Sequence, residues 1–345
     1  MAAKRITMQD IADACGLSRN TVSKIFNGRG AVPEATRRMV MEKAAELGYR
    51  QFPELEPDRA ELRTQTIALL TTHLPEDYHF GSFLLPAFAG QLSRAGYTLM
   101  MYELTPEDVQ LRRLPSHMAL EQTAGLMCIE LFDRDYVDML CEMGLPVIFV
   151  DAYSGATSSL LRFDLISMEN TASTIALTEH LIAAGARRIG FVGDPDHCSS
   201  FHERWMGFCQ ALSNGGIALE RDLCILERDD PDRYINPQWM LERLRRMPAL
   251  PDALLCANDF IAIHLMTALK QMGVSIPDRV LVAGFDGTPQ SAVVEPSLTT
   301  AQIPGAEIGR LAADILLERI ENPGRPFRST YVRTTPIWRA STMRK

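Results

Sequence analysis

From residue 66 onward, apolar runs of strand length alternate with helical patterns, and this alternation restricts the fold more than any other feature. Residues 66–71, 98–102, 126–129 and 147–150 are continuous apolar runs, and helical patterns over about 82–95 and 134–143 end at glycines. Continuous apolar strands separated by helices are typical of a parallel sheet covered on both faces. The pattern therefore predicts an α/β body.

A second series of the same kind starts near residue 163. Its expected strands are residues 189–192, 223–226, 253–256 and 280–283, and its expected helices are about 170–184, 203–214, 237–247 and 259–272. Two series of similar length predict two doubly wound lobes with a cleft between them. Ligands of open α/β sheets bind at the carboxyl ends of strands, so the cleft is the expected ligand site.

The first 27 residues have a different character and read as two short helices around a tight turn. Thr7, with Asp10 three residues later, is the expected N-cap of the first helix, and Gly16 ends it. Ser18 is the expected cap of the second helix, in which Val22 lies on the buried side with Ile25 and Phe26. Pro33 opens a third helix, with Ala35, Met39, Val40, Ala44 and Leu47 expected on its inner face.

The outward face of the second helix carries polar side chains with hydrogen-bond donors. They are Arg19, Asn20, Ser23, Lys24 and Asn27. Arg and Asn can each make two hydrogen bonds to a base edge in the major groove. A helix-turn-helix that binds double-stranded DNA presents such side chains near the start of its second helix.

The charge distribution fits this division. Residues 1–50 contain nine Lys and Arg against five Asp and Glu, a net +4 that leaves −12 for residues 51–345. A basic head on an acidic body suits a protein whose first fifty residues meet phosphate. Because we find no signal peptide and no apolar run long enough to span a membrane, we expect a cytoplasmic protein without membrane contact. Seven cysteines, an odd number mostly in apolar segments, predict free thiols.

The first fifty residues closely resemble the DNA-binding headpiece of the lactose-repressor (LacI/GalR) family of bacterial transcription regulators. The matching stretches are residues 7–12 (Thr-Met-Gln-Asp-Ile-Ala), 16–18, 20–24, 26–27, 33–38 and 46–50. The resemblance continues less strictly through residues 185–193, 203–208, 256–259, 282–286, 296–300 and 309–313. It implies a helix-turn-helix headpiece (1–50), a hinge (51–65) and a two-lobed body like periplasmic sugar-binding proteins (66–345). It adds Thr7, Ser18 and Thr21 to the expected DNA-contacting residues.

The hinge departs from the family pattern. Residues 51–65 contain two prolines and four acidic residues, whereas the family usually has a short basic helix that inserts a leucine into the minor groove. Pro57 would interrupt such a helix, and acidic side chains are repelled by phosphate. Leu62 is the best remaining wedge residue and Leu55 the next. We therefore predict a weaker or differently built hinge.

By resemblance, several polar residues just after strands or at helix starts match the positions that contact a small-molecule effector. They are Asp151, Arg204, Asn258 and Asp286, with Phe80 and Tyr234 as aromatic residues to cover a sugar face. Each could instead be a helix cap or a structural ion pair, and for Asp259 that alternative carries equal weight. The effector implied by the resemblance is a sugar or sugar derivative.

The sequence thus predicts a dimeric repressor that binds a palindromic operator under the control of a small molecule. A solute-binding protein of the same two-lobed fold is disfavoured by the helix-turn-helix. A hydrolase using Asp151 and Asp286 as an acid/base pair lacks a supporting nucleophile–base spacing, and no cofactor motif is present. A zinc site at His197, Cys198 and His202 fits no regular metal spacing, so a loop at the cleft mouth is the favoured interpretation.

Overall fold

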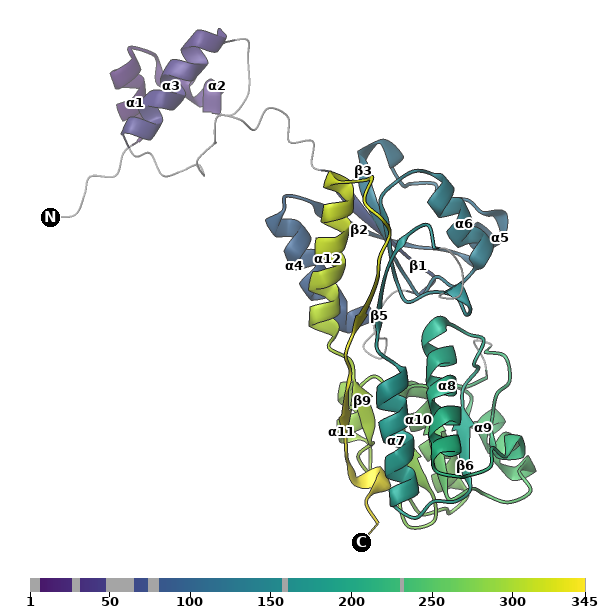
Figure 1. Cartoon of the computed structure of the whole chain (residues 1–345). Coiled ribbons are helices and arrows are strands. Elements are labelled where there is room, and N and C mark those ends of the chain that lie inside the picture. Colours follow the sequence, from purple (N-terminus) through teal and green to yellow (C-terminus); the bar gives the residue numbers. More distant parts are fainter. Residues whose placement is uncertain are drawn as a thin grey trace, which may run out of the picture. The chain divides into compact units, whose positions relative to one another are not determined.

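The computed structural model describes residues 7–26, 32–47, 65–73, 81–156, 161–229 and 233–344. The chain forms two compact units, Met1–Arg63 and Thr64–Lys345 (Figure 1). The predicted domain boundaries at residues 50 and 65 stay predictions, because residues 48–64 lie outside the described part. None of the helices in the described ranges has the length and apolar content needed to cross a membrane.

The first unit is a three-helix headpiece of α1 (Met8–Cys15), α2 (Arg19–Phe26) and α3 (Glu34–Glu46). Its core consists of Ile11, Ala12, Val22, Ile25, Val40 and Ala44. The predicted inner face of α3 was wrong at two positions, because Ala35 and Met39 are exposed. So small a core contacts only one narrow row of α3, and both residues lie beside that row.

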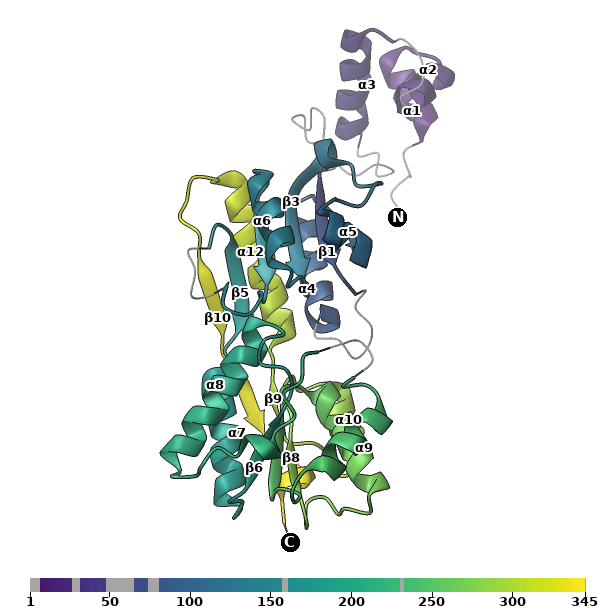
Figure 2. The same ribbon diagram turned by 90° about the vertical axis from the view of Figure 1, so that its right-hand side faces the viewer.

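The second unit contains two lobes (Figure 2). The elements of the first lobe are β1 (Thr66–Thr71), α4 (Gly81–Arg94), β2 (Thr98–Glu103), α5 (Pro106–Leu111), β3 (Thr123–Ile129), α6 (Arg134–Glu142), β4 (Val147–Val150), β5 (Asp164–Met168), α12 (Gly305–Glu321) and β10 (Ser329–Val332). Its six strands are all parallel, in the order β10-β5-β4-β3-β1-β2.

Helices cover both faces of this sheet, as the continuous apolar strands predicted. Along β1, Ile67 and Leu69 join the core beneath α4 and α12, whereas Ala68 and Leu70 join the core beneath α5 and α6. Successive residues of a strand point to opposite faces, so a strand buried on both sides must be apolar throughout. This explains why the sequence pattern identified the strands.

The second lobe has a smaller parallel sheet. Its elements are α7 (Thr171–Ala183), β6 (Ile189–Val192), α8 (Ser199–Asn214), α9 (Pro237–Arg246), β7 (Ala253–Cys256), α10 (Asp259–Gln271), β8 (Leu281–Ala283), α11 (Pro289–Val293), β9 (Thr300–Gln302) and β11 (Thr335–Ile337). A parallel sheet β6-β7-β8 lies between α7 and α8 on one side and α9 and α10 on the other (Figure 2). β9 and β11 form a separate antiparallel pair.

Two expectations about the second series were wrong. The strand near residue 163 is β5, which pairs with β4 and therefore belongs to the first lobe. Residues 223–226 form no regular strand, because a 3-10 turn at Arg221–Leu223 includes the first of them and only Ile225 bridges to Val192. An apolar run indicates burial, and burial alone does not specify strand pairing.

The chain passes between the lobes three times, after β5, before α12 and after β10. Two of these crossings are bonded side by side. The Glu169 N–H donates to the Val332 carbonyl (2.8 Å), and the Thr334 hydroxyl donates to the Glu169 carbonyl (2.7 Å). In the first lobe a buried ion pair joins α12 to β5, with Arg319 Nε 2.8 Å from Asp164 Oδ2.

Candidate nucleic-acid interface and ligand pocket

The start of α1 is fixed by reciprocal capping, as the sequence predicted. The Asp10 N–H donates to Thr7 Oγ1 (3.4 Å), and the Thr7 N–H and hydroxyl donate to Asp10 Oδ2 (2.8 and 2.6 Å). Gly16 ends the helix with a φ of 65°, a conformation that glycine adopts without strain. These local interactions set the turn that leads into α2.

The start of α2 is held by Ser18. The Thr21 N–H donates to Ser18 Oγ (3.1 Å), and the two hydroxyls lie 2.8 Å apart. Behind this cap, Arg19, Asn20 and Lys24 are exposed while Val22 and Ile25 are buried, which is the division that the sequence predicted. Ser23 is half-buried. The exposed side chains supply donors for base edges.

Other residues expected to contact DNA or effector lie outside the described residues. They are Asn27, Leu55, Leu62 and Phe80. Their roles stay predictions.

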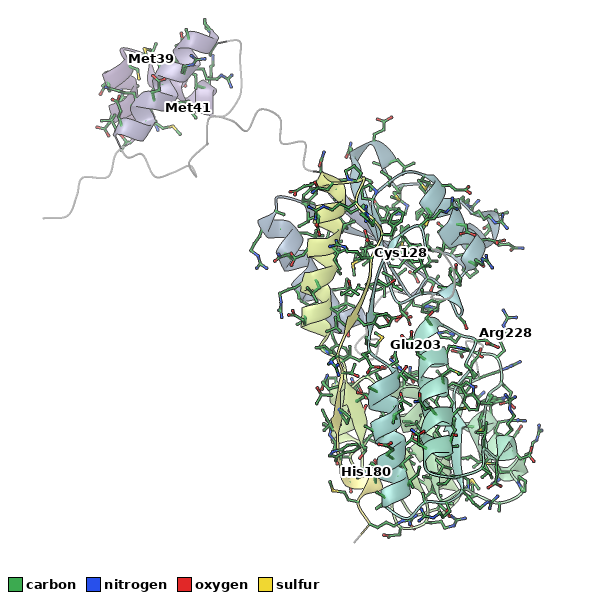
Figure 3. The ribbon with its side chains drawn as sticks, viewed as in Figure 1. Met39, Met41, Cys128, His180, Glu203 and Arg228 are labelled. Carbon is green, nitrogen blue, oxygen red and sulfur yellow. The ribbon has the colours of Figure 1, made fainter. Side chains whose placement is uncertain are left out.

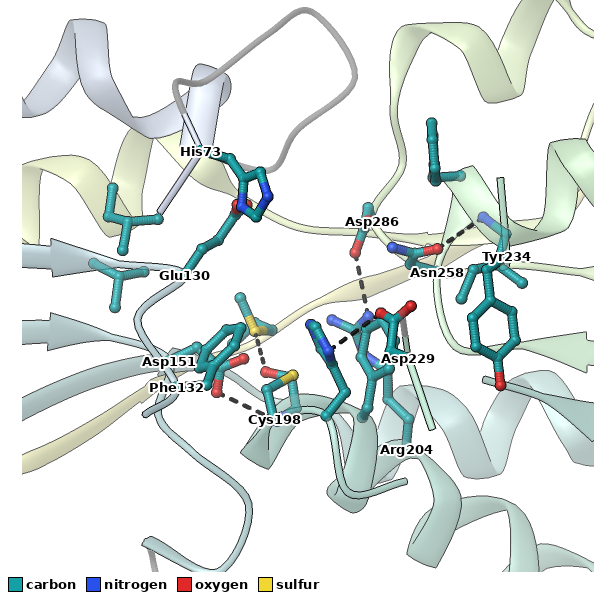
Figure 4. Close-up of a pocket in the computed structure, with 18 of the residues that line it drawn as sticks. His73, Glu130, Phe132, Asp151, Cys198, Arg204, Asp229, Tyr234, Asn258 and Asp286 are labelled. Carbon is teal, nitrogen blue, oxygen red and sulfur yellow. Dashed lines mark hydrogen bonds and ion pairs between the residues drawn. The ribbon is translucent and has the colours of Figure 1, made fainter. Parts of the chain in front are cut away.

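A pocket of about 680 Å³ lies between the two lobes of the second unit. It is lined from both sides, with Glu130 and Asp151 from the first lobe and Arg204, Asn258 and Asp286 from the second (Figure 4). Its volume lies within the range typical of small-molecule sites. The sequence-predicted residues Asp151, Arg204, Tyr234, Asn258 and Asp286 all belong to its lining.

Arg204 and Asp286 form a buried ion pair at this pocket. Arg204 Nη1 lies 3.3 Å from Asp286 Oδ1, and the side chains are 4% and 10% exposed. The guanidinium lies 3.8 Å from the centroid of the Phe285 ring, a favourable cation–π arrangement. Burial raises the pKa of Asp286 to about 7, although Arg204 acts in the opposite direction.

Asn170 holds Arg204 in place, and sequence reasoning did not assign it to the site. Its Oδ1 accepts from Arg204 Nε (2.9 Å), and its Nδ2 donates to Glu203 Oε2 (2.8 Å). Glu203, at the end of α8 nearest the first lobe (Figure 3), also accepts from the Tyr331 hydroxyl on β10 (3.1 Å). Asn170 lies two residues after β5, and a polar residue just after a strand is a weak sequence signal for such a position, although it does not reveal the bond to Arg204.

Asp151 follows β4 and is buried without a basic partner among the described residues. Its Oδ1 accepts from the backbone N–H groups of Ala152 (2.8 Å) and Ser200 (3.3 Å). Burial raises its pKa above the usual range. Asp151, Asp286 and the pocket residue Glu130 all have positive φ, at 62°, 125° and 54°. Strained backbone of this kind clusters at functional sites.

Asn258 and Tyr234 each have a structural role besides lining the pocket. Asn258 Oδ1 caps α10 by accepting from the Ile261 N–H (2.9 Å). The Tyr234 hydroxyl donates to the Glu227 carbonyl (2.7 Å) and points away from the pocket in Figure 4. Only the tyrosine ring is therefore presented to a ligand.

Asp259 is structural. It is fully buried and accepts from the Thr300 hydroxyl (2.5 Å) and the Thr288 N–H (2.8 Å), and it is not part of the pocket lining. Of the two interpretations left open by the sequence, the structural one describes these contacts.

Aromatic rings and a histidine complete the lining, and sequence reasoning did not assign them to ligand contact. The rings are those of Phe132, Phe201 and Phe260. His197 lies at the mouth, 3.2 Å from Asp229 Oδ2 and 5.2 Å from the Phe132 ring. Within the described ranges no group of His, Cys, Asp or Glu could hold a metal ion.

Comparison with known proteins gives different matches for the headpiece and for the two-lobed unit. Residues 7–51 match the profile of bacterial regulatory proteins of the lacI family, and residues 178–342 match that of a periplasmic binding protein-like domain. The ribose operon repressor of Haemophilus influenzae is 28% identical over 97% of this chain and 98% of its own length. The transcriptional repressor PurR of Photobacterium profundum is 28% identical over 92% of each chain.

Two solved structures are similar to this chain over nearly its whole length. The CelR–cellobiose complex is 26% identical, with a TM-score of 0.71 over 98% of this chain and 100% of that one. The lac repressor dimer bound to operator and the anti-inducer ONPF has a TM-score of 0.72 at 24% identity, over 99% of this chain and 100% of that one. The latter likeness concerns the fold.

Proposed function

Because this chain belongs to the lacI family of bacterial regulatory proteins and is a DNA-binding transcriptional repressor, we propose that a small polar molecule in the inter-lobe pocket controls its binding to DNA. The relatives are transcription regulators, so the enzyme and solute-binding alternatives fall away. The repressor acts as a homodimer on a palindromic operator. The dimer and the palindrome are part of this proposal.

The observation that carries the proposal is the buried Arg204–Asp286 pair at a pocket with aromatic walls. Burying a charge costs free energy unless it is paired and hydrogen-bonded. Here the pair faces a space large enough for a sugar, whose hydroxyls can bond the carboxylate and whose apolar faces can contact Phe132 or Phe260. A sugar or sugar derivative therefore fits the lining.

The exposed face of α2 reads the operator. Arg19, Asn20 and Lys24 contact base edges. Thr7 and Ser18 act through capping and phosphate contact, so they affect all DNA sequences alike.

The test uses the full chain. An operator is selected from random duplex DNA, and the repressor's affinity for it is measured with and without members of a sugar panel. A compound that raises the melting temperature of the protein should also change its affinity for the operator. Stabilisation without any change in DNA affinity would argue against control through this pocket.

A further inference from the structure

The charges of the pocket lining are strongly unequal. Glu130 and Asp151 from one lobe face Asp229 and Asp286 from the other. Among the described lining residues there is no lysine, and Arg204 is the single arginine. Besides it, the lining offers only the imidazoles of His73 and His197 as basic groups.

The charge of Arg204 is already matched by groups of the protein. Its Nε donates to Asn170 (2.9 Å), and its Nη1 donates to the Ala257 carbonyl (2.7 Å) and lies 3.3 Å from Asp286. The guanidinium also lies over Phe285. A ligand anion would have to compete with Asp286 for this group.

Asp151 adds a carboxyl group that forms no direct ion pair with a lysine or arginine of the described lining, although the charge of Arg204 acts on its pKa. It receives hydrogen bonds from two backbone amides, and burial raises its pKa. Burial therefore already disfavours the charged forms of Asp151 and Asp286 before a ligand enters, and Glu130 and Asp259 add repulsion at Asp286. A further negative charge would raise the free-energy cost of these charged forms, whereas hydroxyl or amino donors would lower it.

Residues 74–80, 157–160 and 230–232 contain no lysine or arginine. Arg134 lines a separate, adjoining hollow with Tyr153 and Asp196. Its side chain is 70% exposed and lies 4.0 Å from Asp138, so it is not a buried anion site.

We propose that the pocket selects a ligand that bears hydroxyl or amino donors and neither a phosphate nor a carboxylate group. This inference rests on the proposed function and specifies its ligand class. On this proposal the ligand is the substrate of a phosphoryl-transfer step and not its product. A kinase that phosphorylates the ligand would convert it into a molecule that the pocket rejects. The repressor thus reports on the free solute.

The test compares matched compounds that share a ring and differ in charge. The sets are ribose with ribose 5-phosphate, adenosine with its 5′-monophosphate, and glucose with glucosamine, glucuronate and glucose 6-phosphate. Each is titrated into the full chain by calorimetry and thermal shift. In every set that binds, the acidic derivative should bind at least about a hundredfold more weakly than its uncharged parent, because like charges in a buried site repel strongly.

Two variants test whether the pocket carboxylates cause this discrimination. Asp151→Asn keeps the shape of the side chain and should reduce the parent-to-phosphate ratio by roughly tenfold; Glu130→Gln provides a second, independent removal of charge. Asp135→Asn, an exposed acid of α6 that pairs with Arg112, is the matched control and should leave the ratio unchanged.

A phosphorylated compound that binds as tightly as its parent would overturn the inference. Loss of that binding in Arg134→Ala would then assign its phosphate to the adjoining hollow. If no compound of any charge binds, the proposed function itself fails in its assignment of a sugar-type ligand. The two failures are therefore distinguishable.

Discussion

Arg204 Nη1 lies 3.3 Å from Asp286 Oδ1 in a site that excludes almost all water from both side chains. The pair joins α8 to the turn after β8, two segments that are 82 residues apart in the chain. Each residue compensates the buried charge of the other. Removing one partner therefore affects both the ligand site and the surrounding fold.

Replacing Asp286 should weaken ligand binding without altering DNA affinity in the absence of ligand. Asp286→Asn keeps the size of the side chain but removes the charge that faces Arg204, so affinity for a bound sugar should fall about ten- to a hundredfold. Calorimetry on the full chain measures this loss, with Asp135→Asn, at an exposed acid of α6, as control. Ligand binding equal to that of wild type would remove Asp286 from the site.

The Asp151→Asn variant should gain relative stability as pH rises. Burial raises the folded-state pKa of Asp151 above the usual range for an aspartate, so the folded protein holds the proton more tightly than the unfolded chain does. The stabilising effect is complete below the pKa of an Asp in the unfolded chain. It is lost as pH rises through the higher folded-state pKa of Asp151. The amide of the Asp151→Asn variant does not ionise, so its contribution to the free energy of unfolding does not change over this pH range.

The melting temperature of Asp151→Asn minus that of wild type should therefore increase as pH rises from about 4, near the pKa of an Asp in the unfolded chain, to about 8. Scanning calorimetry of the ligand-free proteins at both pH values checks the sign. A difference that shrinks with rising pH would show that ionised Asp151 is stabilised in the folded protein.

Arg19→Ala should impair recognition of the operator selectively. Arg19 is exposed at the start of α2, and loss of one bidentate base contact costs about 1–3 kcal/mol. Gel-shift titrations on selected and random duplexes give the two affinities. Ser18→Ala serves as comparison, since loss of a cap should weaken both alike, and equal losses for Arg19→Ala would indicate a phosphate contact.

The hinge should contribute less to specificity than a helix inserted into the minor groove. Glu54, Glu56, Pro57 and Asp58 disfavour both helix continuity and approach to phosphate. DNA bending on the selected operator decides between the two, because a wedge unstacks a base step and kinks the duplex. A sharp central kink that disappears in Leu62→Ala or Leu55→Ala would contradict this prediction.

Arg319→Ala should destabilise the second unit by about 3–5 kcal/mol, because it leaves the buried Asp164 carboxylate unpaired. The guanidinium bonds both oxygens of Asp164, at 2.8 and 3.1 Å. Denaturant unfolding gives the free energy of unfolding. Arg328→Ala is the control, since Arg328 lies 4.0 Å from Asp164 with 41% of its side chain exposed; an equal loss in the two variants would refute the special role of Arg319.

The sequence predicted the local elements well because each has a local cause. The Thr7–Asp10 cap, the left-handed Gly16 and the doubly apolar strands are determined by neighbouring residues and by burial. The membership of β5 and β10 in one sheet could not be predicted in this way. It depends on the pairing of Ser329–Val332 with Leu165–Met168 across more than 160 residues, for which a single sequence has no periodic signal.

The candidate site was predictable to a similar degree. Polar residues that follow strands, such as Asp151 and Asp286, line one pocket because the strands of each lobe's sheet end facing the cleft. The direction of the Tyr234 hydroxyl was not predictable, because it depends on a carbonyl offered by Glu227. The same holds for Asn170, whose bond to Arg204 requires β5 and α8 to be placed side by side.

The hydrogen bonds at Glu169 and Thr334 join two of the crossings between the lobes side by side. Two chain segments that are hydrogen-bonded side by side bend more easily about an axis perpendicular to them than they twist about their own length. We therefore expect opening and closing of the lobes to share one rotational axis. Ligands of different shape should then change how far the lobes turn more than the direction in which they turn.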